Sequence, residues 1–241
     1  MKLVLEIETS DIEKVHSLLK AQSEHKFVKN RIQKNINTKS VLVSKKAFWK
    51  SLVMCLLTTQ QRSGEDSSVT KFLNLNPNPL EFETCCSQND LRKYVFAVLT
   101  DAKSIRRTNN IGIELETNFI YLERTNWEII SKINSLINID DRFLERKVAT
   151  EIQENLKGIG PKQARNLLQD LGLTKYETPI DSRIIKWLKD FNFPIPLSSM
   201  ALQDKEYYNY VSDILFKLSE SADVKPCVLD AAIFSMFEKN R

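Results

Sequence analysis

The segment LKGIGPKQARNLL, residues 156–168, interrupts a helical pattern with a short turn that contains two glycines. Apolar residues recur at helical spacing up to Leu156, and Pro161 stands where the first turn of a second helix would begin, a position that proline favours. Glycine can adopt a positive φ and lets another group approach the backbone closely. The segment therefore predicts two helices joined by a tight turn, a hairpin over about residues 143–172.

The same turn predicts an anion site. The first N–H groups of a helix have no partner within the helix and lie at the positive end of its dipole, so they bind anions such as a nucleic-acid phosphate. We expect Lys157, Gly158, Ile159 and Gly160 to contact a DNA backbone. The segment lacks the G-K-[ST] ending of a P-loop, and no strand precedes it as a dinucleotide fingerprint requires. The alternative is an ordinary helical hairpin that binds no ligand.

The rest of the chain is also helical in pattern. Periodic apolar residues predict helices over residues 45–57, 143–156, 207–218 and 228–237, and only two short stretches look extended. No apolar run approaches the roughly 18 residues that a membrane span needs. The pattern predicts an all-α fold with little or no sheet.

Charge and cysteine usage point to a nucleic-acid partner inside a cell. Residues 25–64 hold nine basic residues and no acidic one, so Lys45 and Lys46 are predicted phosphate contacts, with a solvated surface as the alternative. The four cysteines show no C-x-x-C spacing, which predicts neither a zinc site nor a disulfide framework and favours a reducing compartment.

The hairpin and the segment ETPIDSRIIKWL that follows it resemble the helix-hairpin-helix DNA glycosylase superfamily. The catalytic lysine of its bifunctional members falls at Lys162, and their catalytic aspartate falls at Asp181, 19 residues later. This separation is most similar to the 8-oxoguanine DNA glycosylase branch, and the chain lacks the four closely spaced cysteines of the iron–sulfur relatives. The resemblance implies two helical lobes with the hairpin at their junction, over residues 41–241, after an N-terminal helical extension, residues 1–40.

The resemblance also implies a reaction, the excision of an oxidised purine followed by cleavage of the strand. A lysine amine can attack C1′ of the nucleotide and form a Schiff base, which allows β-elimination. A carboxylate near C1′ stabilises the positive charge that develops as the base leaves, and Asp181 is also placed to cap the helix that follows it. The alternatives are a bifunctional glycosylase for damaged pyrimidines and a non-catalytic DNA-binding protein. The presence of both Lys162 and Asp181 argues against the non-catalytic alternative.

Further positions are assigned by the resemblance alone. Gln60, at the end of LLTTQQ, is the predicted wedge that fills the gap left by the flipped base, and Gln61 is its alternative. Within DAAIFS, Phe234 is the predicted stacking surface for the base and Asp230 the predicted contact with its edge. The family usually has glutamine at the position of Asp230. A solvated pair of glutamines and a core phenylalanine are the structural alternatives.

The resemblance implies no cofactor and no catalytic metal. The main-chain carbonyls of Glu154, Leu156 and Ile159 are predicted to hold a monovalent cation that bridges to a DNA phosphate. The expected partner is double-stranded DNA that contains a damaged base, with no membrane involved. We expect a monomer that acts inside the cell, with the chromosomal DNA.

Overall fold

The computed structural model describes residues 6–38, 41–61, 64 and 66–238. These residues form helices and no strand, which confirms the predicted all-α fold. The α-helices are α1 (Thr9–Gln22), α2 (Lys26–Ile32), α3 (Lys45–Leu57), α4 (Ser68–Leu73), α5 (Phe82–Cys86), α6 (Leu91–Asp101), α7 (Thr108–Arg124), α8 (Glu128–Asn134), α9 (Arg142–Asn155), α10 (Pro161–Asp170), α11 (Ser182–Asp190), α12 (Lys205–Ser221) and α13 (Pro226–Glu238). A π-helical turn η1 (Gln33–Asn37) follows α2, and a 3₁₀ turn η2 (Ala201–Gln203) precedes α12.

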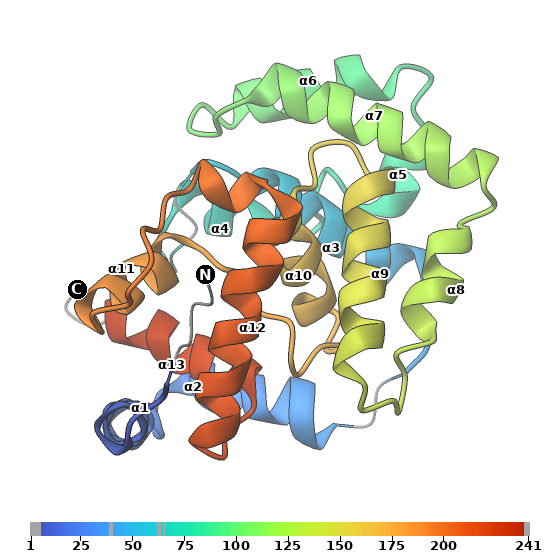
Figure 1. Cartoon of the computed structure of the whole chain (residues 1–241). Helices are drawn as coiled ribbons and strands as arrows, with labels where there is room; N and C mark the ends of the chain where they lie inside the picture. The colour runs from blue at the N-terminus through green and yellow to red at the C-terminus, as the bar shows by residue number, and fades with distance from the viewer. Residues whose placement is uncertain (1–5, 39–40, 62–63, 65, 239–241) are drawn as a thin grey trace.

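The first lobe comprises α3 to α10 and has a core of its own. Helix α3 lies at its centre, because Phe48, Trp49, Leu52 and Leu56 are all fully buried. A helix that is apolar on most of its faces is stable only when other helices surround it. In Figure 1, α6 and α7 lie at one end of the molecule, with α3, α9 and α10 below them.

The second lobe comprises α11 to α13 together with α1 and α2. Its separate core includes Val15 and Val28 from the N-terminal helices, packed with residues of the C-terminal helices. Helices α1 and α2 both pack against α13 (Figure 1). The segment predicted as an N-terminal extension therefore supplies part of this core, and its separation from the rest at residue 40 stays a prediction.

The hairpin α9–α10 lies where the two lobes meet. Helix α9 ends at Asn155, and Pro161 occupies the start of α10, as the sequence predicts. Gly158 has a φ of +80°, in the left-handed region that favours glycine. A Cβ atom at Gly158 would lie 2.6 Å from Cδ of Glu114 and 2.8 Å from Cδ2 of Leu56. The turn can therefore pack onto α3 and α7 only because residue 158 has no side chain.

Within the described part of the chain, no helix has the length and apolar character that a membrane crossing would require.

Candidate active site

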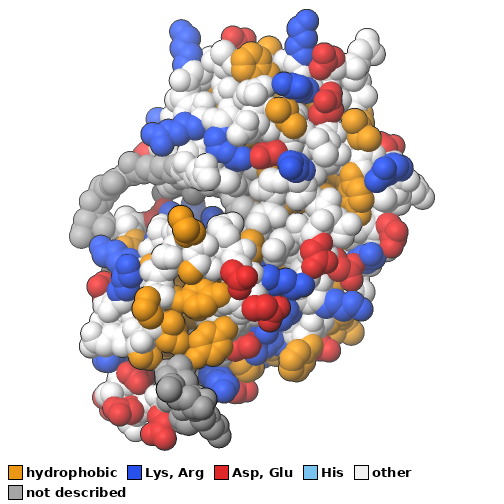
Figure 2. Space-filling model, turned by 45° about the horizontal axis from the view of Figure 1, so that its top comes forward, with side chains coloured by type: hydrophobic (Ala, Val, Ile, Leu, Met, Phe, Trp, Pro, Cys, Tyr) orange, Lys and Arg blue, Asp and Glu red, His pale blue; other side chains and the backbone are white. Residues whose placement is uncertain are grey.

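A cleft of about 1680 Å³ lies between the two lobes. Its walls come from the end of α3, from α7, from the hairpin turn, from the first residues of α10 and α11, and from η2. Figure 2 shows a hollow on this side of the molecule, with Lys and Arg side chains around it. Its charged lining residues are the cations Arg106, Arg107, Arg124, Lys157, Lys162 and Arg183 and the anions Glu154 and Asp181. The excess of cations suits a surface that faces a phosphate backbone.

Lys162 is the second residue of α10, and its side chain lines the cleft. The first hydrogen bond of the helix runs from the N–H of Ala164 to the carbonyl of Gly160. The N–H groups of Lys162 and Gln163 therefore precede the helical hydrogen bonds and are free to meet an anion at this end of α10. The side chain of Lys162 is half-buried and lies beside these N–H groups, where a phosphate can bind.

Asp181 lines the same cleft and caps α11, as the sequence predicts. Its Oδ1 accepts hydrogen bonds from the N–H groups of Arg183, at 2.8 Å, and Ile184, at 3.2 Å. Its Oδ2 accepts from Nη1 of Arg183 at 3.1 Å. These bonds fix the carboxylate at the cleft wall while 22% of the side chain stays exposed. The structure thus brings Lys162 and Asp181 into one cleft.

A buried ion pair joins the helix of Lys162 to the segment that leads to Asp181. Nε of Arg165 donates to Oε2 of Glu177 at 2.9 Å, and Glu177 has no exposed side-chain surface. Nη1 of Arg165 donates to the carbonyl of Pro161 at 3.1 Å, one residue before Lys162. Removing one partner of such a buried pair typically costs about 3 to 5 kcal/mol, because the other charge is then left buried and unpaired. The sequence pattern gave no signal for this pair.

Tyr208 on α12 fixes the residues directly before Asp181. Its buried hydroxyl donates to the carbonyl of Thr178 and accepts from the N–H of Ile180, both at 2.8 Å. These hydrogen bonds hold the extended backbone that would otherwise be free to carry Asp181 away from the cleft.

The end of α3 is held by a residue that sequence reasoning missed. Gln163, next to Lys162, donates through Nε2 to the carbonyl of Cys55 and to the hydroxyl of Thr59, each at 2.7 Å. Gln61 is engaged inside the protein, because its side chain donates to a carbonyl of α3 and accepts the N–H of Arg106 at 2.9 Å. Gln60 is exposed at the cleft with a φ of +58°. This geometry favours Gln60 over Gln61 as the wedge.

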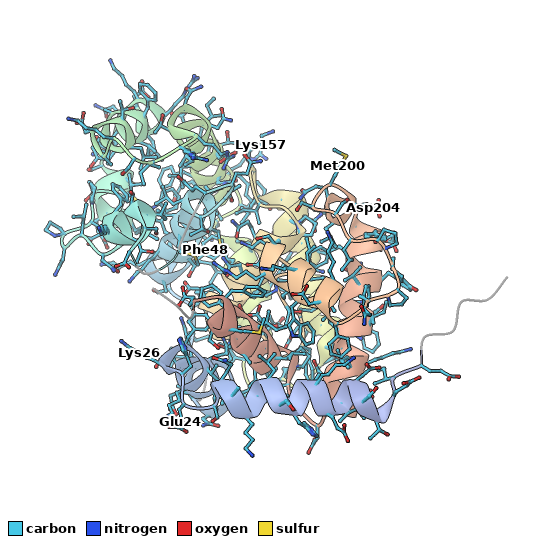
Figure 3. The ribbon with its side chains drawn as sticks, turned by 90° about the vertical axis from the view of Figure 1, so that its left-hand side faces the viewer. Glu24, Lys26, Phe48, Lys157, Met200 and Asp204 are labelled. Atoms are coloured by element: carbon cyan, nitrogen blue, oxygen red, sulfur yellow. The ribbon has the colours of Figure 1, made fainter. Side chains whose placement is uncertain are left out.

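Asn118, a second residue that the sequence did not reveal, clamps the hairpin turn. Its Oδ1 accepts the N–H of Lys157 at 2.7 Å, and its Nδ2 donates to the carbonyl of the same residue at 2.9 Å. The side chain of Lys157 is exposed, and Figure 3 shows it at the same end of the molecule as Met200, which also lines the cleft. In the turn, Gly158 and Gly160 also line the cleft.

The predicted cation site involves three carbonyls of this turn region. The carbonyl of Leu156 accepts the N–H of Ile159 at 3.3 Å, and Ile159 is buried beneath the turn. Together with Glu154, these residues line the cleft. The cation itself stays a prediction.

Lys45 and Lys46 lie away from the cleft. They begin α3, whereas the cleft starts beyond the other end of this 13-residue helix, about 20 Å further on. Lys46 forms an ion pair with Glu83, and Nζ of Lys45 lies 5.0 Å from the ring centroid of Trp127. In the structure Lys45 and Lys46, predicted as phosphate contacts, therefore lie far from the predicted site residues that line the cleft.

Phe234 has no free face in this structure. One face stacks on Phe27, with centroids 4.3 Å apart, and Cζ of Arg183 lies 3.9 Å from the ring centroid. Neither Phe234 nor Asp230 lines the cleft, and Arg183 does. A base would therefore reach Phe234 only after one of these neighbours has moved, a barrier that the sequence did not predict.

Solved structures with a similar fold cover nearly the whole chain. No family model matches the sequence, and no curated protein matches it either. The 8-oxoguanine DNA glycosylase of Methanocaldococcus jannaschii matches with a TM-score of 0.67 and 20% identity, over 95% of this chain and 94% of that one. The 8-oxoguanine glycosylase/lyase of the same organism, in complex with a 15mer DNA containing 8-oxoguanine, matches with a TM-score of 0.69 and 19% identity. The match covers 95% of this chain and 97% of that one.

The 8-oxoguanine DNA glycosylase of Thermotoga maritima matches with a TM-score of 0.62 and 18% identity, over 96% of each chain. Its agreement extends the likeness from an archaeal to a bacterial protein. Over almost its whole length, the chain therefore has the fold of 8-oxoguanine DNA glycosylases.

Proposed function

We propose that the protein is a DNA repair enzyme that excises an oxidised purine, 8-oxoguanine, from double-stranded DNA and then nicks the strand. The observation that carries the proposal is the meeting of Lys162 and Asp181 in one cation-lined cleft beside the hairpin turn. The structural relatives support it, because they are 8-oxoguanine glycosylases and one of them is bound to DNA containing that base.

In this reaction Lys162 is the nucleophile. Its neutral amine forms a bond to C1′ and loses a proton, while the glycosidic bond breaks and its electron pair leaves with the base, which takes up a proton. The C1′–O4′ bond of the sugar then opens: its electron pair leaves with O4′, which takes up a proton, while the nitrogen lone pair forms the C=N bond of a Schiff base. Loss of a proton from C2′ expels the 3′ phosphate and nicks the strand. Lys162 stands at a helix end that binds anions, so a phosphate of the same nucleotide can lie beside it.

Asp181 stabilises the positive charge that develops on the sugar as the base departs. Its carboxylate is fixed by two backbone N–H groups and by Arg183, so little reorganisation is needed when the charge appears. The free N–H groups at the start of α10 and the exposed Lys157 hold the DNA backbone. Gln60 fills the gap that the extruded base leaves in the duplex.

The test is borohydride trapping. Wild-type protein is incubated with duplexes that each contain a single lesion, including 8-oxoguanine and an oxidised pyrimidine, and borohydride reduces any Schiff base to a stable cross-link. We expect a cross-link with 8-oxoguanine DNA for wild type and none for Lys162→Gln. Lys46→Gln serves as the matched control, because it removes the same charge from an exposed side chain remote from the cleft and should still be trapped. Equal trapping of Lys162→Gln and wild type would place the nucleophile elsewhere.

A further inference from the structure

The turn that carries Gln60 adopts a backbone conformation that its own residues do not favour. Gln60 has a φ of +58°, in the left-handed region that a residue with a side chain rarely occupies. Such a residue persists only where its surroundings determine its conformation, and this kind of strain is concentrated at functional sites. The contacts on either side of Gln60 therefore decide where its exposed side chain stands at the cleft.

On one side, the side chain of Gln61 fixes the turn. Its amide donates to the carbonyl of Leu57, in the last turn of α3, and its Oε1 accepts the N–H of Arg106 at 2.9 Å. These bonds tie the chain after Gln60 to the end of α3 and to the loop before α7. They involve no residue of α10, so they cannot place Gln60 relative to Lys162.

On the other side, the side chain of Gln163 completes the end of α3. The N–H of Thr59 donates to the carbonyl of Leu56 at 3.3 Å, so the carbonyl of Cys55 is left to side-chain donors. Nε2 of Gln163 donates to this carbonyl and to the hydroxyl of Thr59, each at 2.7 Å. The last carbonyls of a helix need partners of this kind, since no N–H within the helix reaches them. Gln163 therefore fixes the residue directly before Gln60.

Gln163 is itself held firmly on α10. Only 5% of it is exposed, and its Oε1 accepts from Nδ2 of Asn166 at 3.2 Å, one turn further along the helix. Its main-chain carbonyl accepts from the thiol of Cys55 at 3.5 Å, so the contact between α3 and α10 is reciprocal. Helix α10 packs against α3 (Figure 1), and Lys162 precedes Gln163 in the first turn of α10. One side chain thus joins the helix of the nucleophile to the turn of Gln60.

We propose that Gln163 is a positioning residue that couples extrusion of the damaged base to the attack by Lys162, because it holds Gln60 at a fixed place relative to that lysine. The inference rests on the proposed function, in which Gln60 fills the gap in the duplex while Lys162 reaches C1′ of the extruded nucleotide. Both events concern one nucleotide, so the two side chains must keep a fixed separation. A misplacement of about 1 Å can cost roughly 100-fold in rate.

Gln163→Met tests the inference, because it keeps the length of the side chain and removes both hydrogen bonds to the end of α3. Single-turnover excision of 8-oxoguanine is compared with nicking at a pre-formed abasic site, and the fluorescence of 2-aminopurine beside the lesion reports the opening of the base stack. We expect excision and stack opening to slow by roughly 10- to 100-fold. Nicking should be nearly unchanged, because Lys162 stays in place on α10 and an abasic nucleotide has no base to extrude. Retained nicking also shows that the variant is folded.

A double-mutant cycle separates positioning from a general loss of structure. If Gln163 acts through Gln60, then Gln163→Met should slow excision no further in a protein that already carries Gln60→Ala, because coupled residues give non-additive losses. Thr59→Val removes the hydroxyl that accepts the second hydrogen bond from Gln163, and it should show the same pattern as Gln163→Met.

Gln88→Met is the matched control. Gln88 donates through Nε2 to the carbonyl of Thr84 at 2.9 Å, near the end of α5, and it does not line the cleft. The variant loses the same kind of helix-end hydrogen bond and should behave as wild type in all three assays. Additive losses in the cycle, wild-type excision by Gln163→Met, or equal losses of excision and nicking would overturn this inference alone. If the wild-type protein excises no 8-oxoguanine, the proposed function and this inference both fail.

Discussion

The two glycines of the hairpin turn should respond to substitution in opposite ways. Gly158 has a φ of +80°, and an added Cβ would lie 2.6 Å from Cδ of Glu114. Glu114 cannot easily retreat, since it is buried and its Oε1 accepts from Nη2 of Arg107 at 2.5 Å. A left-handed residue with a side chain costs about 1 to 2 kcal/mol, and overpacking costs about 1 to 3 kcal/mol. Because alanine has a lower conformational entropy than glycine in the unfolded chain, the substitution also stabilises the folded state by about 0.4 to 1 kcal/mol. We therefore expect Gly158→Ala to lose about 1 to 4.5 kcal/mol of unfolding free energy.

Gly160 provides the matched control, because its φ of −88° suits any residue. The nearest atom to an added Cβ is Oε1 of Gln203, at an ordinary contact distance of 3.5 Å. Gly160→Ala should keep or slightly raise the unfolding free energy. Its methyl group would instead stand where a phosphate approaches the free N–H groups of α10, and losing one charge-assisted hydrogen bond weakens DNA binding by roughly 10- to 100-fold.

Urea unfolding followed by circular dichroism and DNA binding followed by fluorescence anisotropy measure the two effects separately. Gly158→Ala with wild-type stability would refute the argument from φ and contact. If Gly160→Ala binds DNA with wild-type affinity, no phosphate binds at this end of α10.

Four further experiments test the site. Asp181→Asn should lower single-turnover base excision by about 100-fold or more while lesion binding persists, and near-wild-type turnover would reduce Asp181 to a helix cap. Asn118→Ala, which leaves both main-chain groups of residue 157 unpaired, should cost about 1 to 3 kcal/mol in urea unfolding, and no loss would mean that water replaces the clamp. Lys157→Ala should reduce the salt slope of log K for DNA binding by about 0.9, whereas Lys46→Ala, remote from the cleft, should leave it unchanged; the reverse result would move the DNA to the start of α3. Burial raises the pKa of Asp230 from 3.8 to about 7, so the folded protein binds this proton more tightly and stability is lost as pH rises through that interval. In wild type, this proton makes the unfolding free energy fall by about 3 kcal/mol between about pH 4.5 and about pH 8, and Asp230→Asn should remove that fall. An unchanged pH dependence in the variant would contradict the burial of a charged carboxylate.

Local chemistry explains which parts of the site could be predicted from the sequence. Pro161 opens α10 and Asp181 caps α11 in the structure, because both preferences depend on a few neighbouring residues. The all-α fold follows in the same way from the spacing of apolar residues. Rules of this kind need no knowledge of which helices pack together.

Contacts between distant parts of the chain could not be predicted in this way. The acid-free run around Lys45 shows that this segment is basic, but not where it lies in the fold. In the structure Lys45 begins α3, at the end of the helix that is remote from the cleft. Two further contacts could not be predicted, because nothing in the sequence around one residue indicates its partner. They are the ion pair of Arg165 with Glu177 and the stacking of Phe27 on Phe234. The cations of the cleft are likewise scattered along the chain and meet only in the folded molecule.

The second lobe joins the two ends of the chain, and this has a consequence for how the protein folds during synthesis. The first lobe is built from one continuous stretch, so its core can form as soon as α10 has left the ribosome. Helices α1 and α2 are made first but cover their apolar faces only when α13 arrives, and the hydroxyl of Ser235 donates to Oε1 of Gln22 across 213 positions of sequence. Such long loops close slowly. The N-terminal helices must therefore stay exposed to chaperones and proteases until α13 has been made, and loss of α13 would expose them again.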